Sequence, residues 1–247
     1  MLMHGSNILL CLRYGIGDVI MELPILDRLR EVLPQARITA LGAEPAVEIL
    51  EADTRVDDVV SIQQWGLGHI DAPADSTTQQ KLIDWLNQAH FDLVLDPSHA
   101  ANAVRKVIRR YGIPIMDCVP AYLDAGLAMG MDGLSAVRHG ARLGWGLEVP
   151  ASCYPTIRVQ PREIEWARTY LEEASLTGDL VAVSLSASSP LKRWPTAHFA
   201  QVCRYLMEQR HTSVLAFGGP GEAGLLHELR DRIGRRGRLE IVQSLHL

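Results

Sequence analysis

The sequence predicts an α/β protein with two successive halves, each built on a parallel sheet covered by helices. Apolar runs of strand length alternate with segments of helical period, which is the pattern of parallel strands joined by helical crossovers. The alternation stops in residues 150–161, a proline-rich stretch without helical period, and then starts again. We therefore expect an interdomain linker in this stretch, with one domain over residues 1–155 and a second over residues 156–247.

In the first half, short apolar runs predict buried strands, and apolar residues at helical spacing predict helices. The expected strands are residues 7–12, 37–42, 57–62 and 91–96. The expected helices are residues 19–32, 45–51, 81–89, 100–111 and 135–146. Residues 66–78 are rich in Gly, Asp, Pro, Ser and Thr and predict a surface loop, whereas residues 112–133 show no readable pattern.

In the second half the same alternation predicts three strands and three helices. The expected helices are residues 162–175, 196–209 and 222–233, and the expected strands are residues 180–185, residues 213–217 and a strand that begins at Leu239. A Rossmann-like sheet normally has more strands than these. We therefore expect the second half to be incomplete.

Composition excludes several classes of protein. A formal net charge of −5 argues against a dedicated nucleic-acid-binding protein, which would carry a basic field. The four cysteines are far apart and show no metal-ligand spacing, so reduced thiols and a cytoplasmic location are expected. The sequence shows neither a secretory signal nor an apolar run of about 18 residues, and no membrane span is expected.

The turn RYGIGDV follows the first expected strand, where loops of a doubly wound sheet face the ligand. Gly15 and Gly17 would let the backbone approach a ligand closely or adopt a positive φ. A GxGxxG dinucleotide motif would need glycine at position 20, which is Ile20. Asp18 has two interpretations: a helix N-cap worth about 1 kcal/mol, or a general base that takes a proton from an acceptor hydroxyl.

Two segments of the second half also follow expected strands. SLSASSPLKRWP combines small hydroxyl residues, Lys192 and a helix start, a pattern that can hold phosphate, although Lys192 and Arg193 could equally be solvated surface charges. FGGPGE predicts a tight turn, with close approach of a ligand to Gly218 and Gly219 as the alternative. The placement of these segments at strand ends in two successive halves indicates a ligand held between domains.

Longer segments carry a resemblance to a known family. Residues 8–42 read ILLCLRYGIGDVIMELPILDRLREVLPQARITALG, a segment with an expected strand, a Gly-Asp turn and an expected helix with a proline. VDDVV, FDLVLD, SLSASSPLKRWPTAHFAQV and SVLAFGGPGE follow in that order and cover nearly the whole chain. In this combination the sequence resembles glycosyltransferase family 9, the ADP-heptose:lipopolysaccharide heptosyltransferases.

The resemblance implies a GT-B fold, in which one Rossmann-like domain holds the acceptor and the other holds the nucleotide sugar. It implies inverting, metal-independent transfer of a heptose from ADP-heptose to a lipopolysaccharide core or other glycan, with the donor as a substrate and no cofactor. Asp18 would be the catalytic base. The other residues that it implies are Lys192, Ser188 and Ser189 at the donor phosphates, Arg13, Gly15 and Gly17 on the acceptor side, and Gly218 and Gly219 near the nucleotide.

The chain also departs from the family pattern. It lacks the Asp-Thr-Gly-x-x-His segment of the family's second domain, so a C-terminally truncated form is expected. Two alternatives to a heptosyltransferase therefore stay open: a noncatalytic remnant or binding module of the same fold, and another GT-B enzyme such as a nucleotide-sugar epimerase. Tyr14 and Gly15 stand where the family often has small hydroxylic residues, so the resemblance does not extend to acceptor specificity.

The expected helix 100–111 carries four cations, Arg105, Lys106, Arg109 and Arg110. These could meet an anionic lipid-linked acceptor or the cytoplasmic face of the inner membrane. The alternative is a solvated helix face, which is the more common role of such a run.

Overall fold

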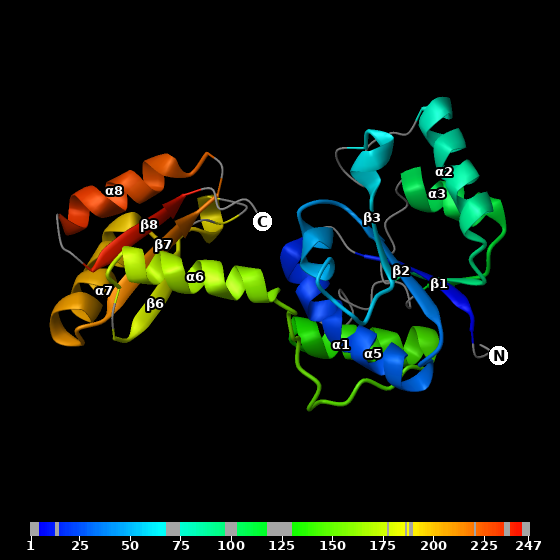
Figure 1. Ribbon diagram of the computed structural model, residues 1–247, viewed down its shortest axis with the longest axis horizontal. Helices are drawn as coiled ribbons and strands as arrows, with labels where there is room; N and C mark the ends of the chain where they lie inside the picture. Colours follow the sequence, from blue (N-terminus) through cyan, green and yellow to red (C-terminus); the bar gives the residue numbers. More distant parts are fainter. Residues whose placement is uncertain are drawn as a thin grey trace. The chain divides into compact units, whose positions relative to one another are not determined.

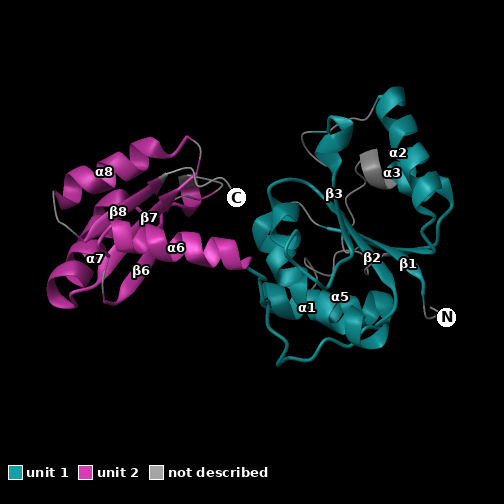
Figure 2. Ribbon diagram, in the orientation of Figure 1, with its two compact units in different colours: residues 1–159 teal, residues 160–247 magenta. Residues whose placement is uncertain are grey.

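The computed structural model describes residues 5–12, 15–67, 75–96, 103–117, 130–176, 178–185, 187, 190–219, 221–234 and 238–243. The chain divides into two compact units, residues 1–159 and residues 160–247, which Figure 2 shows in different colours. Each unit contains its own parallel sheet with helices around it. This is the α/β class that the alternation of apolar runs and helical segments predicted.

The sheet of unit 1 is parallel throughout and has the lateral order β3-β2-β1-β4-β5. Its strands are β1 (Asn7–Cys11), β2 (Arg37–Gly42), β3 (Asp58–Ser61), β4 (Leu93–Asp96) and β5 (Ile115–Asp117). β1 is central, with Ile8 opposite both Ile38 of β2 and Leu93 of β4. The carboxyl ends of β1 and β4 therefore lie side by side at one edge of the sheet.

The residues of β1 pack alternately into two different hydrophobic cores. Ile8 and Leu10 pack in the core that includes residues of α1 (Ile16–Val32) and α5 (Gly133–Trp145). Leu9 and Cys11 pack with residues of α2 (Ser76–Ala89) and α3 (Ala103–Tyr111). Figure 1 shows these two pairs of helices on opposite faces of the sheet. A strand that is buried on both faces reads as an unbroken apolar run, as ILLC does.

Three helices of unit 1 begin earlier than their sequence pattern indicated, and one of them, α5, begins at Gly133 instead of position 135. α1 begins at Ile16 instead of position 19, with Gly15 as its N-cap. α2 begins at Ser76 instead of position 81, because the carboxylate of Asp75 accepts a hydrogen bond from the backbone N–H of Thr78 and caps the helix. Short 3-10 helices, η1 (Ala46–Leu50) and η2 (Ile62–Trp65), follow β2 and β3.

Unit 2 repeats the first part of this arrangement. Its parallel sheet has the order β6-β7-β8, so its strands follow one another laterally as β1, β2 and β3 do in unit 1. The strands are β6 (Leu180–Ser184), β7 (Ser213–Gly218) and β8 (Leu239–Gln243). The helices are α6 (Pro161–Glu173), α7 (Thr196–Gln209) and α8 (Ala223–Ile233), together with a short 3-10 helix, η3 (Pro190–Lys192).

The core of unit 2 lies on one face of its sheet. Val214 and Ala216 of β7 pack there against buried residues of α7 and α8. Along β6, Val183 packs against the same core, whereas Leu180, whose side chain alternates to the other face, is 41% exposed. α6 has no buried residue among those described.

None of the helices in the described part of the chain is both long enough and apolar enough to cross a membrane.

Candidate functional site

The first candidate site residue, Asp18, is held by the strand–turn–helix at the start of the chain. β1 ends at Cys11, and α1 begins at Ile16 with the extended residue Gly15 as its N-cap. Asp18 is therefore the third residue of the helix and not its cap, which corrects the N-cap interpretation. A carboxylate in the first turn still faces the positive end of the helix dipole. The side chain of Asp18 is partly exposed, so it is accessible to a ligand.

Gly15 and Gly17 lie in the same turn, while Arg13 lies outside the described residues. Neither glycine has a positive φ, so the turn does not use glycine for a left-handed conformation. A Cβ atom on Gly17 would meet no atom within 4 Å, and one on Gly15 would lie 3.4 Å from Oδ2 of Asp18. A side chain at position 15 would thus contact the carboxylate of Asp18.

Two further carboxylates lie in this part of unit 1, and sequence reasoning did not assign them to the site. Glu22 follows Asp18 by one helical turn and is 3% exposed. Asp96 ends β4, next to the end of β1, and is 2% exposed. An acid inside the apolar run of a helix or strand is the signal that could have drawn attention to them, because buried carboxylates are rare without partners.

The second candidate segment follows β6. Lys192 ends η3, and its side chain is exposed, while Ser188 and Ser189 lie outside the described residues. Trp194 precedes the N-cap of α7, and its ring packs edge-on against the ring of Phe199, with centroids 5.0 Å apart. This contact joins the positions of a hydrophobic staple and fixes the start of the helix. Lys192 therefore stands just before a firmly positioned helix N-terminus.

The third candidate segment, the turn after β7, is held by Glu222. Its carboxylate accepts a hydrogen bond from the backbone N–H of Gly219, and its own N–H donates to the carbonyl of Gly219. A Cβ atom on Gly218 would lie 2.6 Å from Cδ1 of Leu226, so the absence of a side chain there allows α8 to pack closely on β7. The segment is the tight turn that the sequence predicted, and Gly218 has a packing role in it.

The structure places the two segments of unit 2 at one edge of the same sheet. Ser184, the last residue of β6, is paired with Phe217 of β7, so the loops that follow these strands start from adjacent positions. Lys192 and the Gly218–Gly219 turn are thus in one unit, and Asp18 is in the other. In the described part of the chain, no group of three or more His, Cys, Asp and Glu side chains is arranged to hold a metal ion.

Comparison with solved structures identifies proteins with the same fold. A glycosyl transferase of family 9 from Veillonella parvula DSM 2008 matches with a TM-score of 0.77 and 16% identity, over 98% of this chain and 71% of that chain. The E. coli ADP-heptose lipopolysaccharide heptosyltransferase II matches with a TM-score of 0.68 and 17% identity, over 96% of this chain and 72% of that chain. E. coli heptosyltransferase WaaC with ADP matches with a TM-score of 0.65 and 17% identity, over 98% of this chain and 76% of that chain.

These similarities show an α/β fold with two parallel sheets that resembles GT-B enzymes. The sequence identities of 16–17% are low enough that the match concerns the fold. No protein-family model matches the chain, and no curated protein matches it.

Proposed function

We propose that the chain is a glycosyltransferase of the heptosyltransferase type, which transfers a heptose or related sugar from a nucleotide sugar such as ADP-heptose to a lipopolysaccharide core or other glycan. The observation that carries the proposal is the placement of Asp18 and Lys192. Each lies in a segment that follows the carboxyl end of a parallel strand, one in each unit of a fold that resembles heptosyltransferases. Open parallel sheets bind their ligands beyond these strand ends.

In this proposal Asp18 acts as the general base. Its carboxylate removes the proton of an acceptor hydroxyl while the hydroxyl oxygen attacks the anomeric carbon of the donor sugar. The bond from that carbon to the diphosphate breaks on the opposite side, which inverts the configuration. The partial exposure of Asp18 is consistent with access of an acceptor to the carboxylate. A base of this kind contributes about 10²–10⁴-fold to a rate.

Lys192 has the complementary role in unit 2. Negative charge grows on the diphosphate as it leaves, and a lysine ammonium offsets such charge without a metal ion. We assign Ser188 and Ser189 to the same phosphates as hydrogen-bond donors, and Gly218 and Gly219 to the neighbourhood of the nucleotide. The proposal needs no cofactor, because the ADP-sugar is a substrate.

The proposed acceptor is a lipid-linked glycan at the cytoplasmic face of the inner membrane. Exposed cations on α3 support a peripheral contact with it, since Lys106, Arg109 and Arg110 are all exposed on this helix. Val107 and Ile108 lie between them in the sequence and are buried in the core of unit 1. The basic face is therefore held in place by packing.

Titration with ADP tests the donor half of the proposal. We expect saturable binding of ADP to the chain by calorimetry and a roughly tenfold or greater loss of affinity in Lys192→Ala, because charge-assisted hydrogen bonds to a phosphate are strong. Lys81→Ala, which removes an exposed lysine of α2, is the matched control and should leave the affinity unchanged. Equal affinities for the wild type and Lys192→Ala would show that this lysine does not contact the phosphates.

A further inference from the structure

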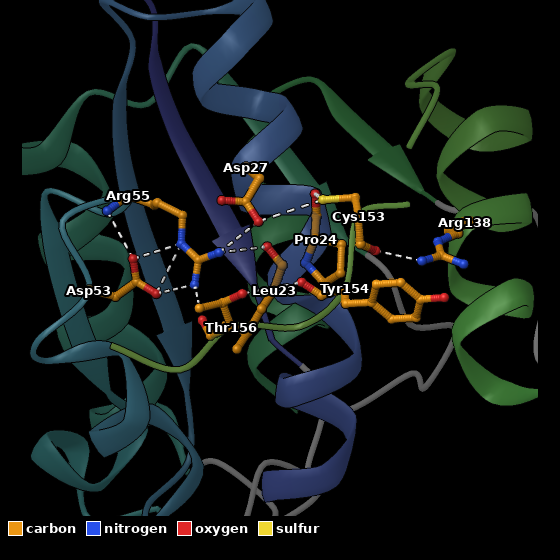
Figure 3. A network of polar contacts seen from close by, with 9 residues as sticks. All are labelled: Leu23, Pro24, Asp27, Asp53, Arg55, Arg138, Cys153, Tyr154 and Thr156. Carbon is orange, nitrogen blue, oxygen red and sulfur yellow. Dashed lines mark hydrogen bonds and ion pairs between the residues drawn. The ribbon is translucent and has the colours of Figure 1, made fainter. Parts of the chain in front are cut away.

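A buried ion-pair network ties the proline-rich segment between the two units to the body of unit 1. Arg55 is at its centre, and its side chain is only 6% exposed. Its guanidinium donates hydrogen bonds to both carboxylate oxygens of Asp53, to Oδ2 of Asp27 in α1, and to the backbone carbonyls of Leu23 and Thr156. Figure 3 shows these groups converging on Arg55 from α1, from the turn before β3 and from the segment that precedes unit 2.

The geometry uses the full hydrogen-bonding capacity of arginine. The five N–H groups of a guanidinium lie in one plane, and here Nε, Nη1 and Nη2 all have acceptors at hydrogen-bond distance. The contact to the carbonyl of Thr156 measures 2.8 Å and spans 101 residues of sequence. Lysine could not replace Arg55, because an ammonium group is a point charge and cannot contact acceptors in several directions of one plane.

A second set of contacts holds the same segment at Cys153 and Tyr154, two to three residues before Thr156. The carbonyl of Cys153 accepts a hydrogen bond from Arg138 of α5, and the guanidinium of Arg138 lies over the ring of Tyr154, 5.7 Å from its centroid. The thiol of Cys153 lies 3.7 Å from Oδ2 of Asp27. Burial raises the pKa of this thiol, and the negative charge of Asp27 raises it further, so the thiol stays protonated at neutral pH and donates to the carboxylate.

The hydrogen bonds end at Thr156, although the positive charge of Arg158 also helps to lower the pKa of Asp53. Ile157 and Val159 are 46% and 53% exposed, and within the described ranges no hydrogen bond to residues 157–159 is found. α6 then begins with a capping box, in which the carboxylate of Glu163 accepts a hydrogen bond from the backbone N–H of Gln160. A stretch of three residues thus separates a clamped segment from a capped helix.

We infer that Arg55 is a latch that fixes where the two units can move relative to each other. With residues 153–156 held by Asp27 of α1, Arg138 of α5 and Arg55, and with α6 starting at residue 161, any hinge movement is confined to residues 157–159. Rearrangement of a few residues at the end of an element is the usual way in which hinges absorb a change of backbone angles. Without the latch, the stretch without such contacts would extend back to residue 155, where the contacts of Arg138 with Cys153 and Tyr154 begin. The inference does not depend on the proposed glycosyl transfer.

Limited trypsin digestion of the chain tests the latch. Trypsin cuts after Arg158, but it needs several residues in extended form on both sides of the bond, and the latch holds those on one side. The variant Asp53→Asn/Arg55→Gln removes both buried charges together, because removal of one alone would leave the other buried without a counter-charge. Mass spectrometry monitors cleavage at the Arg158–Val159 bond. We expect this cleavage to be roughly tenfold faster in the double variant than in the wild type.

The control is Arg37→Gln/Asp58→Asn, which removes an exposed ion pair of the same unit whose side chains are 62% and 40% exposed. It should leave the cleavage rate unchanged. If the test variant keeps the circular dichroism and cooperative unfolding of the wild type and is still cut at the wild-type rate, the latch does not exist.

A covalent replacement of the latch keeps the test decisive even if the double variant is unstable. Asp27→Cys places a thiol beside Cys153, whose sulfur lies 3.7 Å from the present carboxylate. Once mass spectrometry confirms a disulfide between the introduced thiol and Cys153, oxidised protein should be cut at Arg158 several-fold more slowly than the same protein after reduction. This difference is expected in the double variant, whereas in the wild-type background, where Arg55 still holds the carbonyl of Thr156, the two redox states should be cut at similar rates. Equal rates in the two redox states of the double variant would overturn the inference, because the segment would then not control access to the hinge.

Discussion

Arg55 and Asp53 form a buried ion pair in unit 1, and this pair sets the pKa of the aspartate. Burial alone would raise the pKa of Asp53, but the hydrogen bonds and the positive charge of Arg55 outweigh it, so the pKa lies below its usual value. A carboxyl group with a lowered pKa stabilises the folded state while it is ionised. Its contribution is fully present above the pKa of the unfolded chain, about 3.9 for aspartate, and is lost as the pH falls through the folded pKa.

Urea unfolding at several pH values tests this assignment. We expect the wild type to lose more unfolding free energy between pH 5 and pH 3 than Asp53→Asn/Arg55→Gln does, because the variant has no carboxyl group at this position to protonate. Asp57, whose pKa is also lowered despite partial burial, by the N–H of Ile38 and by Arg30, is present in both proteins and cancels in the comparison. Equal losses in the two proteins would contradict the role of the Asp53–Arg55 pair.

The sequence indicated the candidate site better than it indicated this network. Asp18, Lys192 and the glycine turn stand out because each follows an apolar strand directly, and a strand end is a local pattern. Arg55 does not stand out, because its contact with Thr156 joins residues 101 positions apart. A long-range polar contact has no periodicity, and a buried arginine has the same appearance in a sequence as a solvated one.

At the scale of elements, packing between β7 and α8 depends on one glycine. A methyl group on Gly218 would lie 2.6 Å from Cδ1 and 3.1 Å from Cγ of Leu226, which is itself buried. We therefore expect Gly218→Ala to destabilise unit 2 by about 1–3 kcal/mol, the usual cost of overpacking a core. Thermal unfolding measures this effect.

Gly224→Ala, in α8, is the matched control. A Cβ atom there meets no atom within 4 Å, and alanine favours the helical conformation, so the variant should be as stable as the wild type or up to about 1 kcal/mol more stable. If both alanine variants have the same stability, Gly218 is not needed for close packing of α8 on β7.

Elements with a continuous apolar run or a clear helical period were predicted well, and short or capped ones were not. β2 and α7 have the expected bounds, because a continuous apolar run and a helical period are strong patterns. β5 was missed, since it has only three residues and lies in a stretch without a readable pattern. The first turn of α2 was taken for a loop, because its serine and threonines favour loops until Asp75 is recognised as their cap.

At the scale of the whole molecule, the two units share one plan, in which the first three strands are added laterally in the same order. The alternation of apolar and helical segments indicates this plan directly, since each strand–helix repeat has to bury the same kind of surface. The plan places the candidate base in one unit and the candidate phosphate ligand in the other. The latch at Arg55 then limits the connection between the units to three residues.

A transfer assay tests the central claim most directly. The chain is incubated with ADP-heptose and a lipopolysaccharide core that lacks heptose, and the heptosylated product is measured by mass spectrometry. We expect transfer by the wild type and a turnover about 10²-fold or more lower in Asp18→Asn, with unchanged ADP affinity and with Asp84→Asn on α2 as the control. Transfer at the wild-type rate by Asp18→Asn, or no transfer by a wild-type chain that binds ADP, would contradict the account.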